Sequence, residues 1–168
     1  YAALAFLHHC ATLGRPVTVV TRLRLDAALY APAPERTPGT RGCPRKKGDR
    51  LPTLETILAA PDTRWETITV PRWYSQGPRA MEIMSSTAVW YHSGQPAVPI
   101  RWVLIRDPQG ELEPQALLCT DLTAAPLQII SWFIRRWQME TTFHAVREHL
   151  GVETQRQWND QAIARTTP

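Results

Sequence analysis

Residues 133–151 have the sequence FIRRWQMETTFHAVREHLG, and this stretch decides how the rest of the chain is interpreted. Helical composition begins earlier, at Pro126, a residue type favoured in a first turn, and lasts until Gly151, which favours a helix end. Asp121 and Thr123 come before it and offer side chains that can cap its first amide groups. The sequence therefore predicts one long helix that contains most of the quoted stretch.

One stripe of this helix combines charges with an aromatic ring. At about 100° per residue, Phe133, Arg136, Glu140 and Arg147 lie within roughly 60° of one another. An apolar face suited to a core lies beside the stripe and is formed by Trp132, Met139, Phe143, Val146 and Leu150. A carboxylate between two cations, at the border of a buried face, is suited to contact a metal ion and a phosphate chain together.

The same spacing has an ordinary structural interpretation. Arg136 and Glu140 are four residues apart, and such a pair stabilises an exposed helix by only about 0.2–0.5 kcal/mol. Spacing alone therefore favours a surface ion pair over a functional site. The wider sequence around the pair favours function.

That wider sequence resembles a known family. It is similar to the Tyr-x2-Arg-x3-Glu-x6-Lys signature of one large group of DDE transposases from bacterial insertion sequences, with Phe133, Arg136, Glu140 and Arg147 at the four positions. Phe133 lacks the tyrosine hydroxyl and its hydrogen bond, whereas Arg147 keeps the positive charge of the lysine. The resemblance makes Glu140 the final catalytic glutamate and the other three residues contacts to DNA.

The resemblance covers most of the chain, since residues 17–30, 42–48 and 152–168 are also similar to segments of these transposases. It implies an α/β protein with an RNase H-like catalytic core. In this family two Asp and one Glu hold two divalent ions, Mg²⁺ or Mn²⁺, which stabilise the attacking and leaving oxygens during cleavage and strand transfer. The implied partners are double-stranded DNA, as transposon ends and target, and a second copy in a homodimer.

Two of the three metal ligands are expected outside this sequence. A family-like second Asp would lie a few residues before Tyr1, and the first Asp further upstream. The chain is therefore expected to be the C-terminal part of a longer catalytic domain, with Glu140 as its one catalytic and metal-binding carboxylate. We expect this polypeptide alone neither to cleave nor to join DNA. Asp26, at the end of a predicted strand, is expected to be structural, and Asp121 a helix cap.

The rest of the chain divides by composition. Residues 1–30 are predicted to form a helix and a strand, residues 31–65 a basic loop with a short helix, and residues 66–121 a strand-rich segment. The resemblance implies that residues 1–30 belong to the RNase H-like core, and that residues 66–121 are a β-strand-rich insertion before the last catalytic helix, which lies within residues 122–168. The expected strands of the insertion are 66–73, 79–91, 98–106 and 112–120.

Two features of the insertion predict how it packs. The tight turn at Pro108-Gln109-Gly110 indicates that the last two strands form a hairpin. Trp73, Trp90 and Trp102 are expected to pack into the β core in preference to stacking on a flipped base.

The loop of residues 31–52 contains five Pro, three Gly and six Arg or Lys residues. Arg41, Arg45, Lys46 and Lys47 place several cations on extended backbone, as in segments that contact DNA phosphates. A solvated excursion without a ligand explains the same composition equally well. Both interpretations stay open on the sequence.

The whole chain of 168 residues has a net charge of +4, which suits nucleic acid as a partner more than a membrane. Its longest uncharged stretches, such as residues 83–100, are broken by polar residues and Pro, so no membrane-spanning helix is predicted. Cys10, Cys43 and Cys119 fit neither a disulfide framework nor a zinc site, which favours a cytoplasmic protein with reduced thiols.

Two other functions stay open. The chain could be a DNA-binding remnant or domesticated derivative without catalysis, which would keep the basic loop but lack an acidic cluster. It could also be an RNase H-like nuclease that does not transpose, although the strand-rich insertion and the cations around Glu140 argue against this.

Overall fold

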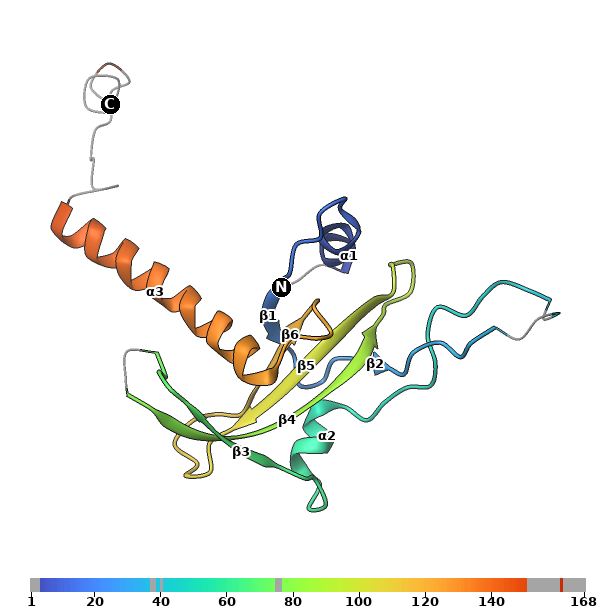
Figure 1. Ribbon diagram of the computed structural model, residues 1–168, viewed down its shortest axis with the longest axis horizontal. Helices are drawn as coiled ribbons and strands as arrows, with labels where there is room; N and C mark the ends of the chain where they lie inside the picture. The colour runs from blue at the N-terminus through green and yellow to red at the C-terminus, as the bar shows by residue number, and fades with distance from the viewer. Residues whose placement is uncertain (1–3, 37–38, 40, 75–76, 151–160, 162–168) are drawn as a thin grey trace.

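A six-stranded antiparallel sheet forms the centre of the computed structural model, which describes residues 4–36, 39, 41–74, 77–150 and 161 (Figure 1). The strands are β1 (Val20–Leu23), β2 (Leu29–Tyr30), β3 (Glu66–Val70), β4 (Arg79–Trp90), β5 (Val98–Arg106) and β6 (Gln115–Cys119). Their order is β1-β6-β5-β4-β2, and β3 also pairs with β4. The long strand β4 therefore pairs with β5 along one edge and with both β2 and β3 along the other.

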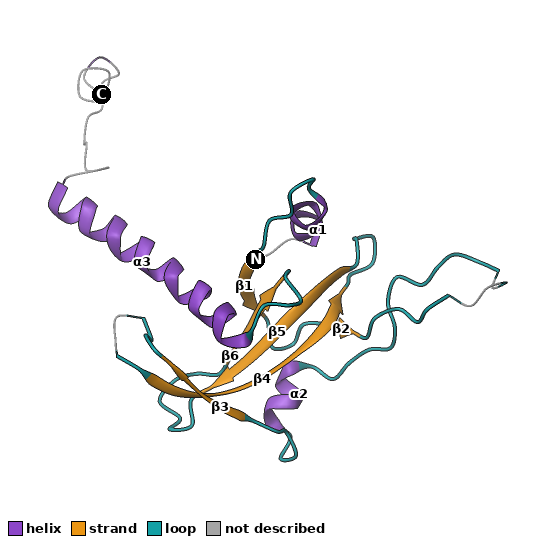
Figure 2. Ribbon diagram, viewed as in Figure 1, coloured by secondary structure: helices purple, strands orange, loops and turns teal. Residues whose placement is uncertain are grey.

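Helices lie on both faces of the sheet, which gives three layers (Figure 2). Helix α3 (Pro126–Leu150) packs on one face, and α1 (Leu4–Thr12) and α2 (Leu54–Ala59) pack on the other. Strand β5 is buried on both sides because successive side chains alternate: Val103 enters the core under α3 and Trp102 the core under α1 and α2. The molecule is a mixed α/β protein, as predicted.

The predicted elements are present, with several strands shorter than expected, and β2 is an additional strand that was not predicted. Strand β3 ends at Val70 rather than at residue 73, since Pro71 has no amide hydrogen to continue the ladder. Strand β6 begins at Gln115 rather than at residue 112, directly after Pro114. The predicted helix end at Gly151, and nearly all of the transposase-like residues 152–168, lie outside the described residues.

The predicted hairpin of β5 and β6 is confirmed, with Leu104 opposite Ala116. Asp107 organises its turn: the carboxylate accepts hydrogen bonds from the amides of Gln109 and Glu111, each at 3.1 Å. Gly110 takes a φ of 71°, a backbone region that glycine enters without steric cost.

The three tryptophans of the insertion pack as expected. Trp73 and Trp102 are buried, and Trp90 is partly buried against the core under α1 and α2. Trp73 stands in the connection after β3 rather than on a strand. Packing is thus the observed role of all three rings.

The first segment of the chain and the insertion share one sheet. Strand β1, within residues 1–30, pairs with β6 so that Val20 lies opposite Cys119 and Leu23 opposite Ala116. The amide of Thr120 donates to the carbonyl of Val19 at 3.1 Å and extends this contact. Strand β1 therefore lies next to the strand that leads into α3.

Candidate functional site

Helix α3 rests on the sheet only over its first part (Figure 1). Ile129, Ile130, Phe133 and Ile134 are buried in the core beneath it. From Arg135 onward the described side chains are exposed, apart from Val146, which is partly buried. We call residues 126–134 the inner half of α3 and residues 135–150 the outer half.

Three of the four signature residues form a stack where the two halves meet. The guanidinium carbon of Arg136 lies 5.5 Å from the centroid of the Phe133 ring. The Nη1 atom of Arg136 then donates to Oε1 of Glu140 at 2.6 Å. The Arg136 and Glu140 side chains are 60% and 43% exposed, so solvent and ligands reach both. Arg147 is exposed further along the same helix.

A second guanidinium, which the sequence did not indicate, reaches the same ring. Arg22 on β1 has its guanidinium carbon 5.8 Å from the Phe133 centroid. Its position follows from the pairing of β1 with β6, where Arg22 lies opposite Leu117. Phe133 therefore carries one cation from a strand and one from its own helix. One of these cations, Arg136, is also paired with Glu140, and cations gathered at one ring attract a phosphate group.

Aromatic contacts join the outer half of α3 to the connection between β3 and β4. The Tyr74 ring meets Trp73 edge-on, with centroids 5.3 Å apart, and meets Trp137 edge-on at 5.8 Å. Such edge-to-face pairs contribute about 0.5–1.5 kcal/mol beyond the area they bury. They fix the helix close to Glu140, because Trp137 lies one turn before it.

The apolar face predicted beside the stripe is wrong for the outer half. Met139 and Phe143 are 60% and 57% exposed, whereas Trp132 packs partly against the core. The burial of Leu150 lies outside what the structure describes. The reason is geometric: helical periodicity predicts which side chains share a face, but not how far the sheet extends beneath them.

Glu140 is the one signature carboxylate, and its Oε2 atom has no protein partner among the described residues. A carboxylate oxygen of this kind is a fitting ligand for a hard cation such as Mg²⁺. Across the described part of the chain, no three His, Cys, Asp or Glu side chains gather in a group that could hold a metal ion. Among the described residues, Glu140 therefore offers a metal ion one ligand without a cluster of others beside it.

The two other acidic residues considered on the sequence make local contacts. Asp26 accepts a hydrogen bond from Nε of Arg24 at 2.7 Å and forms an ion pair with the same guanidinium, which lowers the pKa of its carboxyl. Asp121 accepts from the hydroxyl and the amide of Thr123 at 2.7 and 2.9 Å, and these bonds lower its pKa. Asp121 thus organises the turn before α3 instead of bonding to the first turn of the helix.

The basic loop leaves the sheet beside β2 and extends away from the rest of the molecule (Figure 1). Arg41 and Arg45 line a cavity of about 500 Å³ in it, and Lys46 is exposed. Lys47 behaves differently, because its Nζ atom lies 3.3 Å from the ring centroid of Tyr30 and 4.8 Å from that of Tyr91. Lys47 therefore anchors the base of the loop, and the loop's contact with DNA stays a prediction.

Comparison with known proteins does not extend this picture. No protein-family model matches the chain, and a search of curated proteins found no match to its sequence. Of the helices that the structure describes, none combines the length and apolar character needed to cross a bilayer.

Proposed function

We propose that this chain is part of a DDE transposase with an RNase H-like catalytic core, and that α3 is its last catalytic helix. The observation that carries the proposal is the stack of Phe133, Arg136 and Glu140, which follows the order of the transposase signature along one helix. An ordinary surface ion pair would need only Arg136 and Glu140. The buried Phe133 ring, with Arg22 of β1 as a second cation, is a feature that such an ion pair does not require.

Each residue of the stack has a distinct role in this proposal. Glu140 would hold a metal ion, and Arg136 fixes its carboxylate through a hydrogen bond to Oε1. Arg136, Arg22 and Arg147 bind phosphates of the DNA on either side of the carboxylate, since guanidinium groups match phosphate oxygens in pairs. Phe133 supports Arg22 and Arg136 through its ring, and its side chain has no group that could form a hydrogen bond like that of the signature tyrosine.

Two divalent ions, bound by Glu140 and by two Asp residues outside these 168 residues, would supply the charge that stabilises phosphodiester displacement. The residues of this chain bind and orient the DNA strand around that centre. In the intact protein, two such subunits would act together on the two transposon ends.

The proposal is tested first in the full-length protein. Purified protein is incubated with Mg²⁺ and duplex DNA that carries the transposon end, and cleaved and joined strands are measured. Glu140→Gln is expected to abolish both products. The matched control is Glu148→Gln, because Glu148 lies on the outer half of the same helix, is 60% exposed and pairs with His144. Equal activity of the two variants would refute the role of Glu140.

The 168-residue chain provides a second test. With Mg²⁺ or Mn²⁺ and the same DNA, it is expected to produce no cleavage. Specific nicking that Glu140→Gln removes would show that this chain holds a complete catalytic centre, contrary to the proposal. Genomic sequence upstream without an in-frame Asp shortly before Tyr1 would instead favour a non-catalytic DNA-binding protein.

A further inference from the structure

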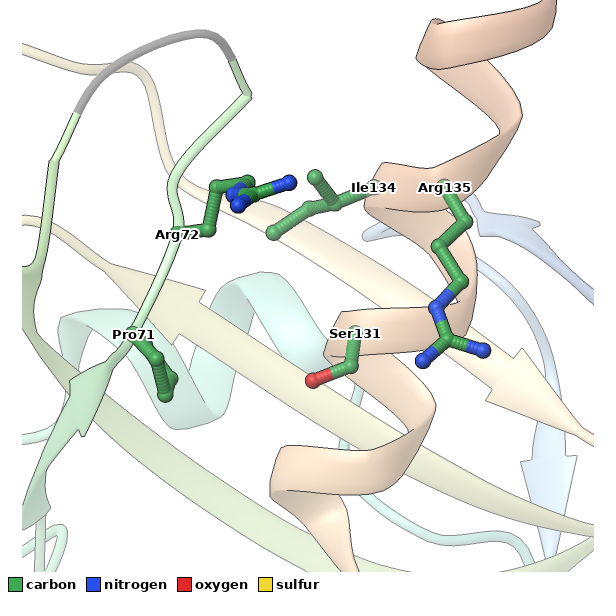
Figure 3. Close-up of a pocket in the computed structure, with 5 residues that line it drawn as sticks. All are labelled: Pro71, Arg72, Ser131, Ile134 and Arg135. Carbon is green, nitrogen blue, oxygen red and sulfur yellow. The ribbon is translucent and has the colours of Figure 1, made fainter.

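A cavity of about 380 Å³ lies between α3 and the connection that follows β3 (Figure 3). Its wall on one side is Pro71 and Arg72, and on the other side Ser131, Ile134 and Arg135. Figure 3 shows the two arginines on opposite sides of this space, with the Ser131 hydroxyl pointing into it. Two elements far apart in the sequence thus each contribute one cation to the same cavity.

Acidic side chains do not balance the charges of this cavity among the residues that the structure describes. The described lining contains no Asp or Glu. Within the described residues, Arg72 and Arg135 have no ion pair and no hydrogen bond from their side chains. Both side chains are exposed. Two guanidinium groups that line one cavity favour an anionic ligand, and a phosphodiester matches the hydrogen-bond geometry of each.

A second cavity continues the first along the helix. It measures about 240 Å³ and is lined by Arg135, Met139, Thr142 and Phe143. Arg135 belongs to both cavities. The Phe143 ring is 57% exposed, which leaves its surface available for stacking. A cationic cleft that runs into an exposed ring is the arrangement by which proteins bind an unpaired nucleic-acid strand.

We propose that this double cleft binds a single nucleic-acid strand, with phosphates held by Arg72 and Arg135 and a base stacked on Phe143. The strand is unpaired because a base inside a duplex has both of its faces covered by neighbouring bases. The net charge of +4 favours nucleic acid over an acidic peptide, and so does the ring beside the cations.

The two cations of this cleft face away from the proposed catalytic surface, whereas Phe143 borders that surface, three residues after Glu140. Arg135 and Glu140 are five residues apart, which turns their side chains about 140° from each other around the helix. Strand binding here therefore does not depend on metal chemistry at Glu140. One proposal can fail while the other holds.

The test is fluorescence anisotropy of a labelled oligothymidine with the 168-residue chain, without divalent metal, over a range of salt concentrations. The variant Arg72→Ala/Arg135→Ala is compared with Arg15→Ala/Arg64→Ala. The control removes the same charge from exposed positions that follow α1 and α2. Each phosphate contact on a single strand contributes roughly 0.7 to the steepness of the plot of log K against log salt. Loss of two contacts is therefore expected to make that plot shallower by about 1.4.

Base stacking is tested separately with Phe143→Leu, which is expected to weaken oligothymidine binding about tenfold and to leave duplex binding unchanged. Circular dichroism confirms that each variant is folded. The proposal is overturned if the cleft variant binds oligothymidine as the charge-matched control does. It is also overturned if a duplex of equal length or a polyglutamate peptide competes as well as the single strand.

Discussion

The inner and outer halves of α3 belong to one continuous helix but obey different constraints. In the inner half, Ile129 and Ile130 are almost completely buried under the sheet. In the outer half, Met139 and Phe143 are more than half exposed although their side chains are as apolar. The comparison teaches that the fold requires the inner half for its core, while the outer half is available for binding and catalysis.

The ion pairs of the molecule show the same division. Arg79 and Asp107 form a pair 2.7 Å apart, in which the Asp107 side chain is 1% exposed. Arg136 and Glu140 on the outer half of α3 form a pair of similar length whose side chains stay open to solvent. A buried pair is required for stability once its partners are desolvated, whereas an exposed pair contributes little.

The largest effect on stability is expected from a substitution in the inner half of α3. Ile130→Ala should lower the free energy of unfolding by about 2–5 kcal/mol, because Ile130 is only 1% exposed and its truncation leaves a cavity in the core. Urea denaturation measures the change, with Met139→Ala as the matched variant on the outer half. A similar loss in both variants would remove the distinction between the halves.

Substitution of the buried Asp107 should have the next largest effect on the stability of the protein, and this effect should depend on pH. Burial acts to raise the pKa of Asp107, but hydrogen bonds from the Gln109 amide, from Arg79 and from the Glu111 amide lower it on balance. A lowered pKa in the folded state stabilises the protein above the unfolded pKa of about 3.9, and this stabilisation is lost as the pH falls through the folded value.

Asp107→Asn should therefore lower the melting temperature by several degrees at pH 7, and the gap from the unmodified protein should shrink below about pH 4. Thermal unfolding followed by circular dichroism from neutral to acidic pH measures this gap. Glu111→Gln serves as control, since the 62% exposed Glu111 side chain also pairs with Arg79. A gap of constant size across the range would contradict the assignment of the effect to Asp107 ionisation.

The smallest effect on stability is expected from a substitution in the outer half of α3. Phe143→Ala should change the free energy of unfolding by no more than about 0.5 kcal/mol, because the ring has little protein contact to lose. Urea denaturation decides this as well. A loss above about 2 kcal/mol, the range of a buried side chain, would mean that the ring is part of the core.

The sequence predicted the sheet well because its information is local. Strand-forming composition located β4 and β5, and proline positions account for the ends of β3 and β6 that the prediction overran. The stack of Phe133, Arg136 and Glu140 was also predictable, since helical spacing alone places these residues on one stripe. What depends on periodicity within one element could be inferred from the sequence.

The remaining features depend on contacts between distant segments. Arg22 reaches Phe133 only because β1 pairs with β6, and Arg72 lines the same cavity as Arg135 only because the segment after β3 lies beside α3. The exposure of Met139 and Phe143 depends on where the sheet ends. No pattern within a single helix or strand contains this information, so neither these contacts nor the exposure of the two side chains was predicted.

The most direct test of the account measures stability and DNA cleavage on one variant of the full-length protein. Glu140→Gln removes only an exposed helical pair, which corresponds to about 0.5 kcal/mol or less in unfolding free energy. The account predicts that the variant unfolds like the unmodified protein and has lost cleavage of transposon-end DNA. Retained cleavage, with or without a loss of stability, would show that Glu140 is an ordinary surface residue.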